Sequence, residues 1–180
     1  MKTVLAVVTV LIIIALCFAW YIGSFTSIKA EDAIEGGYKV VGLEFTGSYS
    51  KSGKWMTEVN EKLKNMGLTF SKGFGIYYDN PQTTPSEKCR SFVGNILGEK
   101  DFNKISELKS AGFKIDSVAR SNSVIAEFPL KSNLSYMVGA MKAYPVLSKY
   151  IAEKNLKVTL SIEIYDIPAK KIIYIMQYNK

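Results

Sequence analysis

The sequence predicts an α+β protein in which an N-terminal transmembrane helix precedes a duplicated strand-helix-strand-strand domain. We expect this domain to have a curved antiparallel sheet with helices on one face. Three observations support the prediction. A long uncharged apolar run opens the chain, apolar residues then recur with strand and helix periods, and two short motifs occur twice in the same order.

The apolar run from Val4 to Ile22 contains one polar residue, Thr9, and no charge. As a helix it would be about 28 Å long, close to the roughly 30 Å thickness of a bilayer core. A cleaved signal peptide is the alternative, but its apolar region is shorter and ends in small residues, whereas Trp20 and Tyr21 stand at this exit. We therefore expect residues 1–23 to be a single-pass anchor that contacts lipid through residues 4–22. Balanced flanking charges leave the side of the membrane open.

Small, polar and charged residues fill positions 24–37, which we predict as a linker, and residues 38–180 are long enough for one domain. The chain has no histidine, which excludes imidazole bases and HExxH zinc sites. Cys89 is the only cysteine of the predicted domain, so no disulfide can form within it. We expect neither a metal nor a cofactor.

Alternating apolar residues predict strands, and apolar residues at steps of three and four predict helices. Strand patterns cover residues 38–45, 74–79, 88–97, 157–165 and 171–178, with further strand-like sequence within 113–128. Helix patterns are carried by Trp55, Val59, Leu63 and Met66, by Phe102, Ile105 and Leu108, and by Leu134, Met137, Val138 and Met141. Pro145 either kinks the last helix or begins a second helical segment.

Two motifs indicate the duplication. Glu44-Phe45 precedes the first long helix and Glu127-Phe128 the last, whereas Tyr78-Asp79-Asn80-Pro81 is matched by Tyr165-Asp166-Ile167-Pro168. The offsets of 83 and 87 residues differ by an insertion in the helix and its loop, where insertions are tolerated. We therefore expect two units around a pseudo-twofold axis, with their strands in one sheet.

The strand at 157–165 carries the candidate site. Side chains alternate along it, so Ile162 and Ile164 share one face, expected to lie under the helices, and Glu163 and Tyr165 share the other. The offset of 87 places Glu163 on Ile76, so only one half has the acid. A carboxylate among aromatic rings has a raised pKa or attracts a cation. The candidate ligand-binding residues are Glu163, Tyr165, Tyr78, Tyr77, Tyr49, Trp55, Tyr136 and Tyr144.

Each of these residues could also have a purely structural role. Glu163 could be a solvated residue on an open sheet face, and the aromatic rings could be ordinary core residues.

The net charge of +7 comes from scattered lysines, so we expect no nucleic-acid groove, although a basic surface could attract anionic lipid.

Three segments carry a resemblance to a known family: Gly75-Ile76-Tyr77-Tyr78-Asp79-Asn80-Pro81, Pro85-Ser86-Glu87-Lys88-Cys89-Arg90 and Glu163-Ile164-Tyr165. Over residues 38–178 the chain resembles the GyrI-like small-molecule-binding domains, in particular a membrane-anchored branch that includes an animal testis-expressed ER-phagy receptor. The resemblance implies the duplicated SHS2 effector-binding fold, with a ligand cleft between the halves and Glu163 facing aromatic groups. Some soluble members of this fold hydrolyse strained toxins with a Glu and a Tyr or Trp.

Two departures limit what the resemblance implies. The chain ends at Lys180, directly after the last strand, so we do not expect a tail with an autophagy motif. A membrane helix occupies the place of a DNA-binding helix-turn-helix. We expect a membrane-anchored protein that binds a small aromatic or cationic molecule and is not an enzyme. The alternatives are a hydrolase of reactive electrophiles that uses Glu163, and a membrane-surface adaptor for a protein partner.

Overall fold

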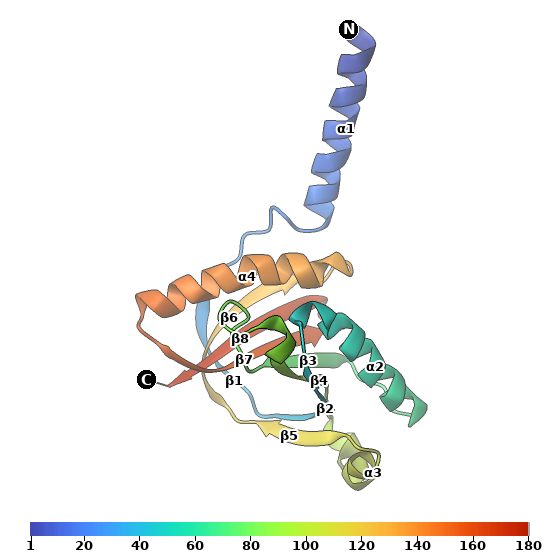
Figure 1. Ribbon diagram of the computed structural model, residues 1–180, viewed down its shortest axis with the longest axis vertical. Helices are drawn as coiled ribbons and strands as arrows, with labels where there is room; N and C mark the ends of the chain where they lie inside the picture. Colours follow the sequence, from blue (N-terminus) through green and yellow to red (C-terminus); the bar gives the residue numbers. More distant parts are fainter. Residues whose placement is uncertain (180) are drawn as a thin grey trace.

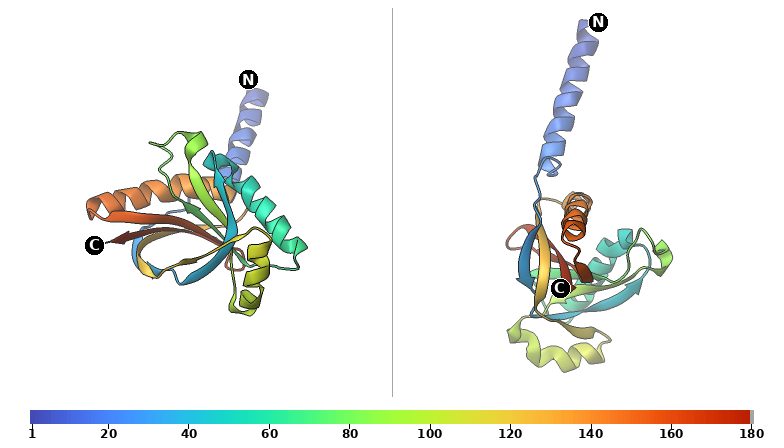
Figure 2. Two further views of the ribbon diagram at one scale, coloured as in Figure 1. Left: turned by 60° about the horizontal axis from the view of Figure 1, so that its bottom comes forward. Right: turned by 90° about the vertical axis from the view of Figure 1, so that its left-hand side faces the viewer.

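A long N-terminal helix precedes an α+β domain in the computed structural model, which describes residues 1–179 (Figure 1). Helix α1 (Lys2–Tyr21) has a mean hydropathy of 2.8 over its most apolar window, and none of its residues is buried. It is long and apolar enough to cross a membrane. The helix leaves the domain beside α4 (Leu134–Glu153) (Figures 1 and 2).

The domain is built on one antiparallel sheet of eight strands in the order β1-β6-β8-β7-β3-β4-β2-β5. The strands are β1 (Glu31–Glu35), β2 (Tyr38–Thr46), β3 (Lys72–Tyr77), β4 (Arg90–Ile96), β5 (Lys114–Val118), β6 (Ser121–Pro129), β7 (Lys157–Asp166) and β8 (Lys171–Asn179). The other helices are α2 (Ser52–Asn65) and α3 (Ile105–Ser110), with 3₁₀ turns at Tyr49–Lys51, Ser86–Lys88 and Glu99–Lys104.

The strand order confirms the predicted duplication. The units β2-α2-β3-β4 and β6-α4-β7-β8 lie side by side, and the series β6-β8-β7 mirrors β2-β4-β3 about the β3–β7 pair. Strands β1 and β5 extend the two edges. The pair at the centre of this pseudosymmetry therefore brings one strand of each unit together beneath the two long helices (Figure 2).

The sheet curls so that both of its faces are buried. Val118 at one edge is joined through a two-residue turn to β6 near the other edge, and the Gln177 amide donates to the carbonyls of Glu35 and Ala119 there. The inner face forms an apolar core that includes Phe74, Ile76, Phe92, Val40, Ile162, Ile164 and Ile175. The expectation that Ile162 and Ile164 lie under the helices is therefore wrong, because this inner face has a core of its own.

The outer face carries the helices. Trp55, Val59 and Leu63 of α2 pack with Val41 and Val93 of the sheet. Helix α4 packs through Ala143 and Leu147, and it runs unbroken through Pro145, so the two segments considered for this region are one helix. Gly139 lets α4 approach closely, since a Cβ there would lie 2.5 Å from the Tyr174 hydroxyl oxygen.

The linker prediction differs from the structure at residues 31–35, which form β1 and pair with β6. This strand is short, charged and at an edge, so its pairing comes from backbone hydrogen bonds and leaves little hydrophobic pattern in the sequence. Asp32 also accepts hydrogen bonds from Tyr150 of α4 (2.8 Å) and from Lys154 directly after the helix (2.7 Å). The chain is thus held to the domain soon after it leaves α1.

Candidate ligand-binding cleft

The floor of the candidate site is formed by β3 and β7 where they face α2 and α4. Glu163 and Tyr165 on β7 lie opposite Gly75 and Gly73 on β3. A Cβ at Gly75 would lie 2.8 Å from the Tyr77 hydroxyl oxygen, and one at Gly73 would lie 3.2 Å from the Tyr165 ring. The two glycines therefore make the space that the tyrosines occupy beside the carboxylate.

The orientation of the side chains on β3 and β7 corrects the repeat alignment at Glu163. The sequence offset of 87 residues aligns Glu163 with Ile76. In the structure, however, Ile76 pairs with Ile162 and faces the inner core, whereas Glu163 lies on the helix side of the sheet. On the helix side, β3 contributes Gly73, Gly75 and Tyr77. Between these two central strands, β7 alone supplies a carboxylate to this side of the sheet.

Glu163 is buried, with 8% of its surface exposed. The Tyr144 hydroxyl donates to one carboxylate oxygen at 2.6 Å, and the Tyr165 hydroxyl donates to the other at 2.7 Å. Burial raises the pKa of Glu163, and the two phenol donors oppose the rise. Within residues 1–179, no lysine or arginine forms an ion pair with it. The Glu163 carboxylate therefore has hydrogen bonds but no countercharge.

The tyrosines around Glu163 form a connected network. The Tyr77 and Tyr165 hydroxyl oxygens lie 3.1 Å apart, which extends the hydrogen bonds from Glu163 toward α2. Burial and the nearby Glu163 charge raise the pKa values of Tyr77, Tyr144 and Tyr165. These phenols therefore stay protonated and act as donors at neutral pH.

Two further tyrosines flank this network. The Tyr49 ring meets the Tyr77 ring edge-on with centroids 4.8 Å apart, and the Tyr136 ring meets the Tyr165 ring edge-on at 5.3 Å. Between α2 and α4 lies an open cleft of about 1740 Å³. Its lining includes Met56, Asn60, Ala140, Ser148 and Met176 as well as Glu163 and the tyrosines at 49, 77, 136, 144 and 165.

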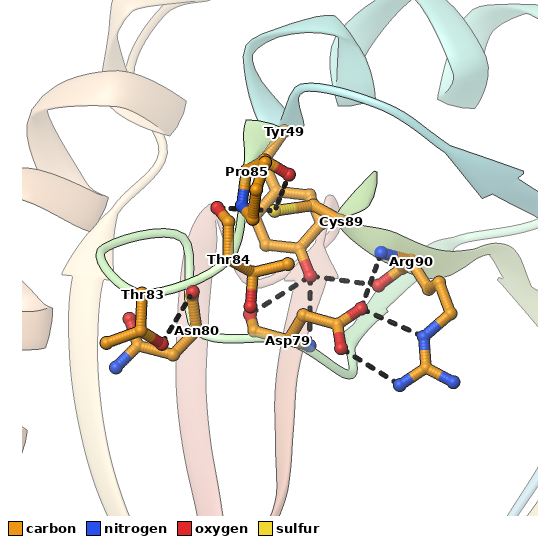
Figure 3. Close-up of polar contacts among 8 residues, drawn as sticks. All are labelled: Tyr49, Asp79, Asn80, Thr83, Thr84, Pro85, Cys89 and Arg90. Atoms are coloured by element: carbon orange, nitrogen blue, oxygen red, sulfur yellow. Dashed lines mark hydrogen bonds and ion pairs between the residues drawn. The ribbon is translucent and has the colours of Figure 1, made fainter. Parts of the chain in front are cut away.

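The Tyr49 hydroxyl forms hydrogen bonds with backbone groups after the end of β3 and at the start of β4 (Figure 3). It donates to the Arg90 carbonyl at 2.9 Å and accepts from the Asp79 amide at 3.1 Å. Arg90 in turn binds the Asp79 carboxylate through its backbone amide, Nε and Nη2, at 2.7, 3.0 and 2.9 Å. Tyr49 therefore presents its ring to the cleft while its hydroxyl fixes the loop at the rim.

Two of the predicted site residues lie outside the Glu163 network, although Tyr78 is among the residues that line the cleft. Trp55 stacks on Phe45 with ring centroids 4.9 Å apart and belongs to the core beneath α2. Tyr78 follows the end of β3, and its ring lies beside the Arg90 guanidinium, 5.9 Å from Cζ to the ring centroid. Neither residue reaches the Glu163 network.

Sequence reasoning missed a polar pair on the α2 side of the cleft. Asn95 of β4 is 4% exposed, and its amide donates to Asn60 Oδ1 of α2 at 2.6 Å. Both residues line the cleft. An amide between the apolar residues Val93 and Ile96 was the available signal, because buried polar side chains need a partner.

This arrangement can stabilise a bound cation. Electrostatic attraction between opposite charges is strong at a site from which water is largely excluded, and aromatic rings add about 0.5–2 kcal/mol of cation–π attraction. A flat or aromatic cation would also bury apolar surface against the tyrosines and methionines. The cleft thus places a buried carboxylate beside several tyrosine rings.

Comparison with known proteins identifies similar sequences. The chain is 39% identical over 127 residues to the "Testis-expressed protein 264 homolog" of Mus musculus, covering 66% of this chain and 38% of that protein. It is 32% identical over 165 residues to "Testis-expressed protein 264" of Homo sapiens, covering 86% and 50% respectively. The chain thus spans half or less of the length of these curated relatives. No protein-family profile matches it.

Solved structures are similar in fold. The C-terminal domain of EcmrR aligns with a TM-score of 0.58 at 14% identity, covering 85% of this chain and 98% of that domain. EcmrR in a complex with DNA aligns at 0.56 and 16% identity, covering 85% and 58%. SAV2435 bound to tetraphenylphosphonium aligns at 0.51 and 10% identity, covering 84% and 94%. The domain of this protein has the GyrI-like fold.

Proposed function

We propose that this protein is held in a membrane by α1 and binds a small organic cation with aromatic character between α2 and α4. The proposal rests chiefly on Glu163, a buried carboxylate with two phenol donors and no cationic partner within residues 1–179. Charge of this kind is costly to bury without a counterion. A bound cation would supply that counterion.

The aromatic surroundings support the choice of ligand. Tyr49, Tyr77, Tyr136 and Tyr165 form two edge-on ring pairs on the floor and walls of the cleft. SAV2435, which has the same fold, is bound to tetraphenylphosphonium, a cation with four aromatic rings.

The membrane part of the proposal rests on α1. Its 20 residues include one charged side chain, Lys2, and Trp20 and Tyr21 lie at its end, where aromatic residues favour the membrane–water interface. Retention of the full chain in the membrane pellet at alkaline pH tests this part. Release of the protein into the supernatant would contradict the anchor.

Ions of opposite charge and similar shape test the ligand site. In calorimetric titrations we expect tetraphenylphosphonium to bind and tetraphenylborate, its anionic counterpart in shape, not to bind. Glu163→Gln should weaken cation binding by tenfold or more (on the order of 1.4 kcal/mol per factor of ten) without creating a site for the anion. Glu107→Gln, on the exposed surface of α3, is the matched control and should leave the titration unchanged. Equal binding of the cation by Glu163→Gln and the parent protein would overturn the proposal.

A further inference from the structure

Helix α4 has an uncharged, largely apolar outer surface at the side of the domain where α1 ends. The residues on its side opposite the core are all exposed and uncharged, and we call them the α4 crest: Leu134, Met137, Met141, Pro145, Ser148 and Ala152. Met137 is 57% exposed and Met141 is 70% exposed. The exposed side of a surface helix normally carries charged residues, whereas the α4 crest carries none.

The segment after α1 is packed against the same helix and its neighbouring strand. Gly23 lies against the Phe128 ring, where an added Cβ would come within 2.7 Å of it, and Ile28 packs in the core formed by α4 and β6. The Lys142 ammonium group donates to the Ser24 carbonyl. These contacts place α4 at the side of the domain from which α1 departs (Figures 1 and 2).

Basic residues flank the crest. Lys142 and Lys149 lie on one side of it, and Lys131 before the helix has its ammonium group 5.3 Å from the centroid of the Trp20 ring. Glu153 is the acidic residue of α4 itself, and Lys149 Nζ lies 3.8 Å from its carboxylate. An apolar stripe beside lysines is the composition of helices that lie in a membrane interface.

We propose that the α4 crest lies on the bilayer in which α1 is inserted, with its lysines at anionic headgroups. The proposal rests on the membrane anchor proposed above, because α1 brings the crest to the lipid surface. Met137 belongs both to the crest and to the cleft lining, so the cleft opens beside the bilayer. Amphiphilic cations concentrated in the lipid then reach Glu163 from the membrane surface.

Fluorescence quenching in vesicles tests the position of the crest. The full chain, with Cys17→Ala, is reconstituted in phosphatidylcholine vesicles that contain phosphatidylserine. An environment-sensitive fluorophore is attached at Met141→Cys or, as the matched control, at Lys109→Cys on α3, far from α1 (Figure 1). Cys89 is 1% exposed, and the parent without an added cysteine checks that it takes up no label. We expect lipids brominated near the headgroup to quench the Met141 label several-fold more than the Lys109 label.

Lys149→Glu should reduce the quenching of the Met141 label, and Glu153→Gln should not reduce it. Equal quenching of the labels at positions 141 and 109 would overturn the docking of α4 on the bilayer. A label at position 141 that is shielded from aqueous iodide but not quenched by brominated lipid would also overturn it, because that pattern indicates a protein partner. Extraction of the protein at alkaline pH would instead contradict the anchor. Retention of the protein without quenching at position 141 would contradict the docking alone.

Discussion

Burial of the Glu163 side chain makes the stability of the folded protein depend on pH. Burial raises the pKa of Glu163, so the folded protein holds the Glu163 proton more tightly than the unfolded chain does. The stability linked to this proton is complete below the pKa of the unfolded chain and is lost as the pH rises through the raised folded pKa. A rise in pH from acid toward neutrality therefore lowers the free energy of unfolding.

We predict that Glu163→Gln is more stable than the parent protein at neutral pH, because glutamine keeps the shape of the side chain and cannot ionise. Chemical denaturation should show a difference that grows as the pH rises through the raised pKa and disappears in acid. Glu107→Gln, on an exposed helix face, provides the control for a surface change of the same chemistry. A Glu163→Gln variant that is less stable than the parent at every pH would contradict this account.

The residues around Glu163 could be predicted from the sequence, but the position of each aromatic ring could not. Glu163, Tyr165, Tyr77, Tyr144 and Tyr136 come together as expected, with Tyr49 beside them. Trp55 lies in the core, since a large ring at helical spacing satisfies core packing and a cleft wall equally well. Only contacts between strands and helices that are distant in the sequence decide between the two.

At the scale of the elements, the width of the cleft depends on how closely α4 approaches the sheet. Gly139 faces Phe128 and Tyr174, and a Cβ there would lie 2.9 Å from the Phe128 ring and 2.5 Å from the Tyr174 hydroxyl. Neither ring has free space to move, because Phe128 is 1% exposed and Tyr174 is fully buried.

We therefore predict that Gly139→Ala lowers the free energy of unfolding by about 1–3 kcal/mol, the usual cost of overpacking a core. It should also weaken tetraphenylphosphonium binding, because α4 must move away from β8. Gly53→Ala in α2 is the control, since nothing lies within 4 Å of its added Cβ and alanine is the better helix former by up to about 1 kcal/mol. Thermal and denaturant unfolding check both variants, and equal stability of the two would be inconsistent with the close approach described here.

Most helices and strands were predictable to within a few residues, but β1, the division of residues 113–128 into β5 and β6, and the faces of β7 were not. Alternation in this strand correctly separates Ile162 and Ile164 from Glu163 and Tyr165. It cannot say which set lies under the helices, because the curled sheet buries apolar residues on both faces. Helix α4 was similarly ambiguous, since the effect of Pro145 depends on packing along the whole helix.

At the scale of the whole molecule, β1 connects α1 to the rest of the GyrI-like domain. Asp32 accepts hydrogen bonds from Tyr150, Lys154 and Tyr178, and these donors and the Lys154 charge keep the pKa of Asp32 below its usual range. This contribution to stability is present above the unfolded-chain pKa and is lost as the pH falls through the lowered pKa. Strand β1 has no hydrophobic pattern by which it could be predicted, because it is held by backbone pairing and by these polar contacts.

We predict that Asp32→Asn loosens β1 locally at neutral pH and leaves the central strands unchanged. Hydrogen exchange should become faster in residues 31–35 and remain the same in β3 and β7. Glu31→Gln, in the same strand, is the matched control and should have no such effect. Unchanged protection of β1 in Asp32→Asn would show that backbone pairing alone fixes this strand to the domain.

The most direct test of the whole account is the titration of the Glu163 side-chain carboxyl group by carbon-13 NMR, with and without tetraphenylphosphonium. The account predicts a pKa above the usual range for a glutamate in the free protein, because the carboxylate is buried without a countercharge. A saturating cation should lower that pKa, since it favours the ionised form. An ordinary pKa in the free protein, or one that the bound cation does not lower, would contradict the assignment of Glu163 as the cation-binding group.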